Sequence, residues 1–207
     1  ALTEQGQAKE GIAQMQRGLT ISRTVRSALG LTSALAKLAE AYGKVEQVEE
    51  GLTVLTEALA MVNQTGECVY EAELYRIKGE LTLQQFQVSG SKFQVEKGPR
   101  SKVRSPKSKN TDPRPLTPDS QGEAEACFHK ALEVSRRQQA KSLELRATMS
   151  LAHLWQQQGK HHEAHQMLSE IYNWFTEGFD TKDLREAKAL LEELASSDFR
   201  LDEMVER

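Results

Sequence analysis

The chain contains an internal repeat with a period of 40 residues, and this repeat constrains the fold more than any other feature. The first two copies match at four positions each, Gly11, Met15, Gly18 and Leu19 with Gly51, Leu55, Ala58 and Leu59. The last two copies match at three positions each, Ala124, Phe128 and Ala131 with Ala164, Leu168 and Ile171. Small and large side chains at this spacing share one helix face, where the small ones let two helices approach closely. The pattern predicts stacked helical hairpins.

The distance between the middle copies is too long for this period. Gly51 and Ala124 are 73 positions apart, an excess of 33 residues. The stretch 88–121 holds all five prolines, few apolar residues, and eight Lys or Arg against three Asp or Glu, a net charge of 8 − 3 = +5. Such a composition favours disorder. We therefore predict that 88–121 is an insertion within the third hairpin, and that Glu71–Phe86 packs against Gln121–Arg137.

The rest of the chain has the composition of a helical protein. Of the 207 residues, 38% are hydrophobic and only 6% aromatic, and Ala, Leu, Glu, Gln and Lys, all strong helix formers, dominate. One apolar stripe follows the last hairpin and predicts a capping helix, with Leu184, Ala187, Leu190, Leu191 and Leu194. The predicted organisation is one all-α solenoid formed by 1–87 and 122–195, interrupted by the insertion at 88–121 and followed by a tail at 196–207.

Three stretches resemble tetratricopeptide repeats. They are LAKLAEAY (35–42), AEACFHKAL (124–132) and LAHLWQQQGKHHEAHQML (151–168), and they fit W-x2-L-G-x2-Y followed by A-x3-F-x2-A. The period differs, about 40 rather than about 34 residues, which implies helices longer by roughly a turn. The resemblance implies a right-handed α-solenoid of tetratricopeptide-like hairpins with a C-terminal capping helix, acting as a protein–protein interaction scaffold.

A narrower resemblance concerns bacterial signal transduction. The stretches ELYRIKGEL (73–81), AKSLELRATMSLAHLW (140–155) and IYNWFTEGFDTKDLREAKALLEEL (171–194) resemble the C-terminal repeat region of certain bacterial multidomain proteins. Those proteins join a class III nucleotide cyclase, or another signalling domain, to a signal-transduction ATPase module. The resemblance implies a sensing or scaffolding segment of such a protein. Because the chain begins at Ala1 and is helical almost at once, we expect it to be part of a longer protein.

The sequence gives no pattern of catalytic residues. It has no phosphate-binding loop, GxSxG elbow or Cys/His nucleophile pair, so we predict no enzymatic activity and no cofactor. His161 and His165 lie four residues apart on a helix and could share a zinc ion, but no third ligand follows, so we predict no metal site. We assign the carboxylates Glu71, Glu73 and Glu80 to solvated helix faces.

The two cysteines and the hydropathy pattern bear on the cellular compartment. Cys68 and Cys127 lack metal or redox spacing, and we predict that both are small buried hydrophobic residues. No apolar run approaches the length of a membrane span, and no secretory signal opens the chain. The sequence therefore predicts a cytoplasmic location.

The concave groove formed by the first helices of the hairpins is the predicted binding surface. The candidate groove-lining residues are Glu40, Tyr75, Thr82, Arg146, Met149, His153 and Gln156. The expected partner is a protein or peptide, which includes other domains of the same polypeptide. The alternative for these residues is contact with the capping helix or a neighbouring hairpin. Ala36 and Glu40 stand where carboxylate-binding tetratricopeptide domains carry Lys and Asn, which disfavours a C-terminal carboxylate as ligand.

Two other functions stay open at this stage. The chain could be a segment of a nucleotide cyclase or ATPase whose catalytic domains lie elsewhere in the parent protein. It could also bind nucleic acid or another anionic surface through the basic insertion. Phe93 is the only aromatic residue of that insertion, and nucleic-acid stacking surfaces need several, so binding to nucleic acid is disfavoured.

Overall fold

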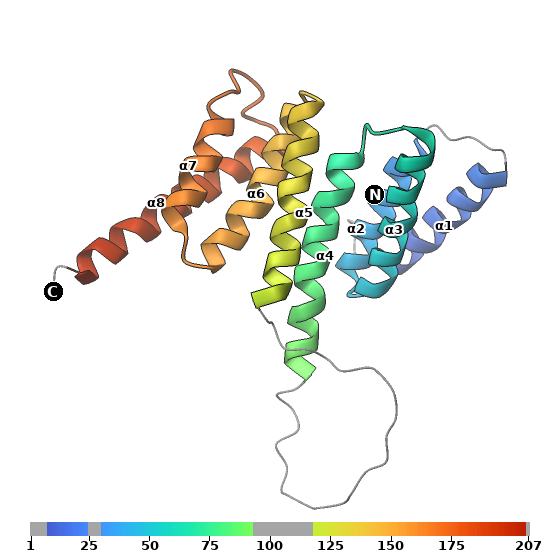
Figure 1. The fold of residues 1–207 in the computed structure, drawn as a ribbon, viewed down its shortest axis with the longest axis horizontal. Helices are drawn as coiled ribbons and strands as arrows, with labels where there is room; N and C mark the ends of the chain where they lie inside the picture. The colour runs from blue at the N-terminus through green and yellow to red at the C-terminus, as the bar shows by residue number, and fades with distance from the viewer. Residues whose placement is uncertain (1–7, 25–29, 93–117, 206–207) are drawn as a thin grey trace, which may run out of the picture.

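The computed structural model describes residues 8–24, 30–92 and 118–205, which form helices and short connections without any strand (Figure 1). The helices are α1 (Ala8–Thr24), α2 (Leu31–Lys44), α3 (Val48–Thr65), α4 (Glu71–Lys92), α5 (Pro118–Arg137), α6 (Lys141–Gln157), α7 (His161–Tyr172) and α8 (Lys182–Val205). The predicted all-α class is confirmed for this part of the chain.

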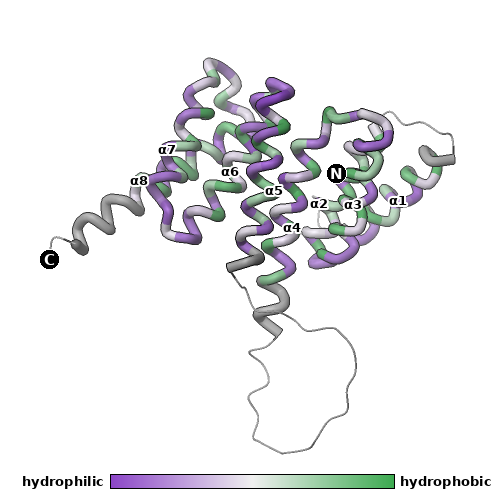
Figure 2. The backbone as a smooth tube through the Cα atoms, in the orientation of Figure 1, coloured by the Kyte–Doolittle hydropathy of each residue, from purple (hydrophilic) through white to green (hydrophobic). Residues whose placement is uncertain are grey.

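The repeat positions form the contacts between helices. Hydrophobic and hydrophilic residues are interspersed along the helices (Figure 2), and α4, which contacts α2, α3, α5 and α6, buries residues on more than one side. Most matched positions of α3, α5 and α7 are fully buried, with Leu55, Ala58, Ala124, Phe128, Ala131, Ala164 and Leu168 each at 0% exposure, while Leu59 is half-buried. The repeated positions are therefore the residues through which α3, α5 and α7 pack against their neighbours.

The helices pair into hairpins that stack in chain order. Each helix packs against the next, and α2, α4, α6 and α8 also contact one another in succession. In the described part of the chain, no such contacts join α3 to α5 or α5 to α7. We call α2, α4, α6 and α8 the inner helices and α3, α5 and α7 the outer helices. Because, among the described residues, the inner helices contact one another and the outer helices do not, the array is concave on the side of the inner helices.

The third hairpin is closed by a contact between a glycine and a phenylalanine. A Cβ atom placed on Gly79 of α4 would lie 2.5 Å from Cε1 of Phe128 on α5, so only glycine leaves room for this buried ring. Helices α4 and α5 lie side by side along much of their length (Figure 1). The predicted packing of Glu71–Phe86 on Gln121–Arg137 is confirmed.

The contact between α4 and the preceding hairpin is also apolar and close. Leu81 of α4 is buried between two glycines, and a Cβ atom would lie 2.6 Å from its Cδ2 at Gly43 and 2.7 Å from its Cδ1 at Gly51. Gln84 adds one polar contact, since its Nε2 donates a hydrogen bond to the Gly43 carbonyl at 2.9 Å. The shape of one leucine thus positions α4 on α2 and α3.

Two predictions, on the ends of α4 and α5 and on the cysteines, are corrected. Residues 88–92 and 118–121, assigned to the insertion, are helical, since polar residues readily extend a helix that is already nucleated and Pro118 suits a first helical position. The remaining residues, 93–117, lie outside the described part of the chain. For the tail at 196–207 we expected at most a frayed helix, and helix α8 continues through 196–205. Cys68 is exposed in the connection between α3 and α4, and Cys127 is half-buried, so neither is a buried core residue.

Candidate functional site

A groove of about 510 Å³ lies on the concave side of the solenoid. It is lined by residues from α2, α4, α6 and α8, the four helices that contact one another in succession. Four of the predicted candidates lie in it, namely Glu40, Arg146, Met149 and His153. The capping helix forms one wall with Lys182, Asp183, Glu186, Ala189, Leu190 and Glu193. The groove is therefore a product of the stack, and no single hairpin contains it.

The floor of the groove contains a buried ion pair within α4. Nε and Nη2 of Arg76 donate hydrogen bonds to Oε2 and Oε1 of Glu73 at 2.9 and 2.7 Å. Arg76 and Glu73 are only 7% and 5% exposed. Nη1 of Arg76 also donates a hydrogen bond to Glu80 one turn later. This two-pronged geometry fixes the guanidinium in one orientation.

The ion pair is extended to the neighbouring inner helices. Nη2 of Arg146 on α6 lies 2.9 Å from Oε1 of Glu73, and the Ser150 hydroxyl donates a hydrogen bond to Oε1 of Glu80 at 2.8 Å. Nε of Arg146 lies 3.9 Å from Oδ2 of Asp183 on α8. Charged contacts therefore connect α4, α6 and α8 across the floor of the groove.

Two side chains that line the groove, Arg76 and Glu40, have pKa values shifted in favour of the charged form. Burial alone would lower the pKa of the Arg76 guanidinium, but the hydrogen bond with Glu73 and the negative charges of Glu80, Glu73 and Glu40 raise it above its ordinary value. Partial burial would raise the pKa of Glu40, but the hydrogen bond and charge of Lys44, and the charges of Arg76 and Arg146, lower it overall. Both groups are charged at neutral pH.

The walls of the groove expose carboxylates. The side chains of Glu40, Glu80, Asp183 and Glu186 are 38%, 42%, 39% and 57% exposed. The two arginines of the floor are less accessible, at 8% for Arg76 and 33% for Arg146. Apart from Lys182, which is 79% exposed, the accessible charges of the groove walls are therefore negative.

A smaller hollow of about 300 Å³ adjoins the groove between α4 and α6. The two share Glu80, Ser150 and His153. The hollow is otherwise lined by Leu83, Gln84, Phe128, Leu154 and Gln157, and so contributes apolar surface. Together the two form one depression that is charged over α2, α4, α6 and α8 and includes apolar side chains between α4 and α6.

Three of the predicted candidates lie away from the groove. Tyr75 is half-buried and packs against the apolar cluster of α5 and α6. Thr82 is buried, and its hydroxyl donates a hydrogen bond to the Lys78 carbonyl at 2.8 Å. Gln156 is half-buried near the end of α6 and is not among the lining residues.

The assignment of the α4 carboxylates to solvent is wrong for Glu71 and Glu73, whereas Glu80 is 42% exposed. Glu73 is buried in the ion pair with Arg76, Glu80 is bonded to the same arginine, and Glu71 lies 2.9 Å from Nη2 of Arg137 on α5. A signal was present in the sequence, because Glu73, Arg76 and Glu80 follow the i, i+3, i+7 spacing of one helix face. That spacing alone does not reveal that α6 covers the face.

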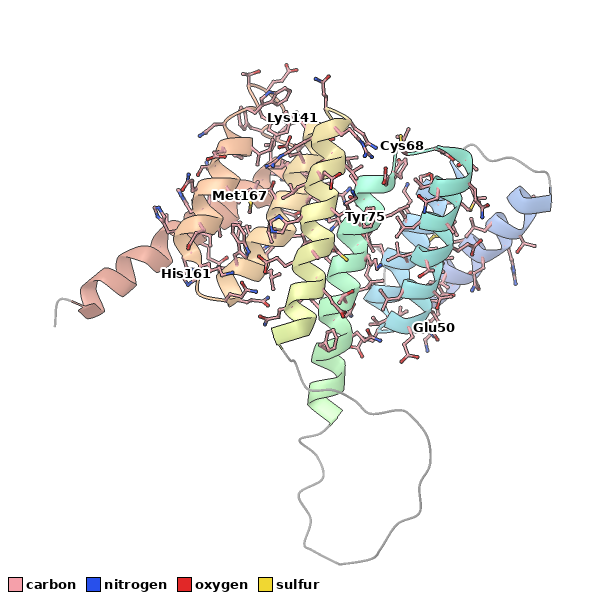
Figure 3. The ribbon with its side chains drawn as sticks, viewed as in Figure 1. Glu50, Cys68, Tyr75, Lys141, His161 and Met167 are labelled. Carbon is pink, nitrogen blue, oxygen red and sulfur yellow. The ribbon has the colours of Figure 1, made fainter. Side chains whose placement is uncertain are left out.

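A second surface lies at the end of the solenoid where outer helices pass to the next inner helices. Three of the large exposed hydrophobic residues of the described chain lie in these connections, namely Val69, Trp174 and Phe179. Nζ of Lys141 lies 5.7 Å from the ring centroid of Trp174. A hollow of about 490 Å³ is lined here by residues that include Cys68, Val69 and Leu143. Cys68 and Lys141 lie at this same end (Figure 3).

No group of three His, Cys, Asp or Glu side chains suited to a metal ion occurs among the residues that the structure describes. Within the same residues, no helix combines the length and apolar character needed to cross a membrane.

The comparisons with known proteins concern the fold. No family model and no curated protein matches the chain. Two crystal structures of nearly identical TPR-like repeats of a putative kinesin light chain from Podosopora anserina match it with a TM-score of 0.53 each. They share 13% and 14% sequence identity with it, and the alignments cover 99% of this chain and 85% of those chains. The chain folds as an all-α solenoid of TPR-like helical hairpins.

Proposed function

We propose that the chain is a non-catalytic module that binds a protein or peptide segment in the groove formed by α2, α4, α6 and α8. The observation that carries this proposal is that four successive inner helices contribute to one depression, whose floor is fixed by the Glu73–Arg76 ion pair. A floor that is already ordered costs little conformational entropy when a ligand binds. Concave solenoid surfaces of this kind are suited to extended ligands.

The shape and lining of the depression favour a polypeptide over a small molecule. Sites for small molecules are enclosed and mostly apolar. Here the groove has exposed carboxylates on its walls and continues into the hollow around Leu83 and Leu154. An extended chain or a helix can contact both parts, whereas a compact ligand would contact only one.

The sequence resemblance indicates what kind of larger protein contains this module. We infer a C-terminal sensing or scaffolding segment of a larger bacterial signalling protein in the cytoplasm. The ligand would then be either a separate protein or another domain of the same polypeptide. The reading frame of the full-length gene tests this: a cyclase, other signalling or ATPase domain upstream of Ala1 supports it, and the absence of any such domain contradicts it.

The binding proposal is tested by selecting displayed random peptides on the purified chain. The selected peptides are then measured against a double variant, Met149→Ala with His153→Ala, which removes two side chains of the groove. The matched control is Met61→Ala with His162→Ala, which removes the same two residue types, one half-buried and one exposed, from α3 and α7.

We expect the groove variant to weaken peptide binding by about tenfold or more, which corresponds to about 1.4 kcal/mol. The control variant should leave the dissociation constant within about twofold of the wild-type value, well below that threshold. Circular dichroism melts of both variants establish that they fold. Equal binding by the groove variant and the wild-type chain would overturn the proposal.

A further inference from the structure

Negative charge predominates among the residues that line the groove. Five carboxylates, from Glu40, Glu80, Asp183, Glu186 and Glu193, face three cations, from Arg76, Arg146 and Lys182. The carboxylates come from both sides of the groove, since α2 and α4 supply two and α8 supplies three. The potential inside the groove therefore attracts positive charge and repels phosphate and carboxylate groups.

The three cations are already engaged with carboxylates of the protein. Arg76 is bonded to Glu73 and Glu80, and Arg146 lies 2.9 Å from Glu73. Nζ of Lys182 lies 3.7 Å from Oε1 of Glu186. An anionic ligand would have to displace one of these pairs, and displacing Arg76 or Arg146 would leave Glu73 buried with fewer partners.

The carboxylates are better placed to meet a ligand than the two arginines are. Glu40 and Glu186 are 38% and 57% exposed and pair only with the exposed Lys44 and Lys182. Exposed pairs of this kind contribute little stability, so a cation of the ligand can replace either lysine at small cost. The groove can therefore accept positive charge without breaking its buried floor.

The apolar part of the depression adds a second requirement. The accessible apolar side chains are Met149 and Ala189 in the groove and Leu83 in the hollow beside it, where Phe128 and Leu154 lie beneath the surface. We propose that this depression binds a cationic, amphipathic segment of a protein, whose Lys or Arg side chains meet Glu40 and Glu186 while its apolar side chains enter the hollow. This inference rests on the proposed function and specifies the chemical class of the partner.

The test uses three fluorescein-labelled peptides of about fifteen residues, the length of a three- to four-turn helix. The peptides share one Leu/Ala pattern and differ only in carrying four Lys, four Gln or four Glu on the opposite face. Fluorescence anisotropy gives the dissociation constant of each peptide for the full chain. We expect the Lys peptide to bind about tenfold tighter than the Gln peptide, with the Glu peptide weakest. Binding of the Lys peptide should weaken as salt is raised.

A pair of double variants tests whether the carboxylates of the groove are the ones that bind the Lys peptide. Glu40→Gln with Glu186→Gln removes two carboxylates from the groove, and Glu163→Gln with Glu170→Gln removes two exposed carboxylates from α7 on the outer side. The net charge of the chain changes equally in both. We expect the first variant to bind the Lys peptide about tenfold more weakly and the second to bind like the wild-type chain.

Three results would overturn the inference. Equal affinity for the three peptides would remove the requirement for positive charge. Equal weakening by both double variants would mean that net charge, rather than the groove, attracts the peptide. Spermidine competing as well as the Lys peptide would remove the requirement for apolar contact. If displayed peptides bind the groove without enrichment in Lys or Arg, the proposed function stands and only this inference falls.

Discussion

The two sides of α4 are joined to their neighbours by different kinds of contact. Toward the preceding hairpin, Leu81 is buried between Gly43 and Gly51. Toward the following hairpin, Glu73 and Arg76 form a buried ion pair that Arg146 of α6 also contacts. The first contact depends on shape and excludes water, and the second depends on charge and borders the groove.

The difference indicates how one helix can serve both stability and binding. Apolar contacts such as that of Leu81 stabilise by removing surface from water and by close packing. A buried ion pair contributes little net stability because desolvation offsets the attraction, but it is costly to break and it fixes geometry. Five predictions separate the two contributions, in order of decreasing effect.

Substitution of Arg76 should have the largest effect. Arg76→Met leaves the buried Glu73 carboxylate without its two-pronged partner, and we expect the free energy of unfolding to fall by about 4 kcal/mol. The measurement is urea denaturation followed by circular dichroism. The double variant Glu73→Gln with Arg76→Met should be more stable than Arg76→Met alone, since no buried charge is left. A double variant that is less stable would contradict this account.

Truncation of Leu81 should have the next largest effect. Leu81→Ala removes a side chain that is 3% exposed and leaves a cavity beside α2 and α3, which should cost about 3 kcal/mol. The same denaturation experiment measures this cost. A change below about 1 kcal/mol would show that the helices close around the smaller side chain.

Gly43→Ala should destabilise by about 1–2 kcal/mol, because its Cβ would lie 2.6 Å from Cδ2 of Leu81. The neighbours of that Cβ are side-chain atoms, so the same substitution made in the Leu81→Ala chain should cost nothing or stabilise. A double-mutant cycle measures this coupling. Gly122→Ala on α5 is the control, since no atom lies within 4 Å of the added Cβ, and it should be neutral or stabilising. Additive costs at positions 43 and 81 would contradict the packing described for Leu81.

The pH dependence of stability should distinguish the two kinds of contact. Burial would raise the pKa of Glu144, but the hydrogen bonds and charges of Lys141 and Arg136 lower it below its ordinary value of 4.5. A carboxyl whose pKa is lower in the folded state stabilises the fold above its unfolded-state pKa, and this contribution is lost as the pH falls through the folded-state pKa.

Glu144→Gln should therefore cost about 1 kcal/mol at pH 7 and progressively less as the pH falls below 4.5. Urea denaturation at several pH values measures this cost. The cost of Leu81→Ala, an apolar contact, should stay constant over the same range. A cost of Glu144→Gln that did not change with pH would show that the carboxylate contributes through packing rather than charge.

Ser150→Ala should have the smallest effect. It removes the hydrogen bond from the Ser150 hydroxyl to Oε1 of Glu80, and we expect a loss of about 0.5–1 kcal/mol. Differential scanning calorimetry is sensitive enough to detect it as a lower Tm. An unchanged Tm would mean that the groove floor is held by Arg76 and Arg146 without this bond.

The fold could be predicted from the sequence because its contacts recur at a fixed interval. The match between Phe128 and Leu168, 40 positions apart, implied the outer helices of two hairpins before their partners were known. The helix ends were less predictable, since the extension of α4 to Lys92 depends on a helix that is already formed rather than on local apolar spacing. Local sequence therefore predicts the buried face of a helix better than it predicts the residue at which the helix ends.

The groove could be predicted only in part. Glu40, Arg146, Met149 and His153 followed from their position on inner helices, because the face of such a helix is set by its own periodicity. The contribution of α8 did not follow, since the sequence indicated a cap without indicating that its polar side would form a wall. The burial of Glu73 depends on how α6 crosses α4, and no single segment encodes that angle.

The connection between α4 and α5 has a thermodynamic consequence for the middle of the molecule. It spans residues 93–117, whereas three residues, 45–47, join α2 to α3. Bringing the ends of a connection about eight times longer together costs roughly 2 kcal/mol of additional chain entropy. Helices α4 and α5, at 22 and 20 residues, form the longest hairpin of the array. The packing between them, which includes the fully buried Phe128 against Gly79, can offset this cost. The array is therefore joined at its centre by contact between helices more than by a short covalent link.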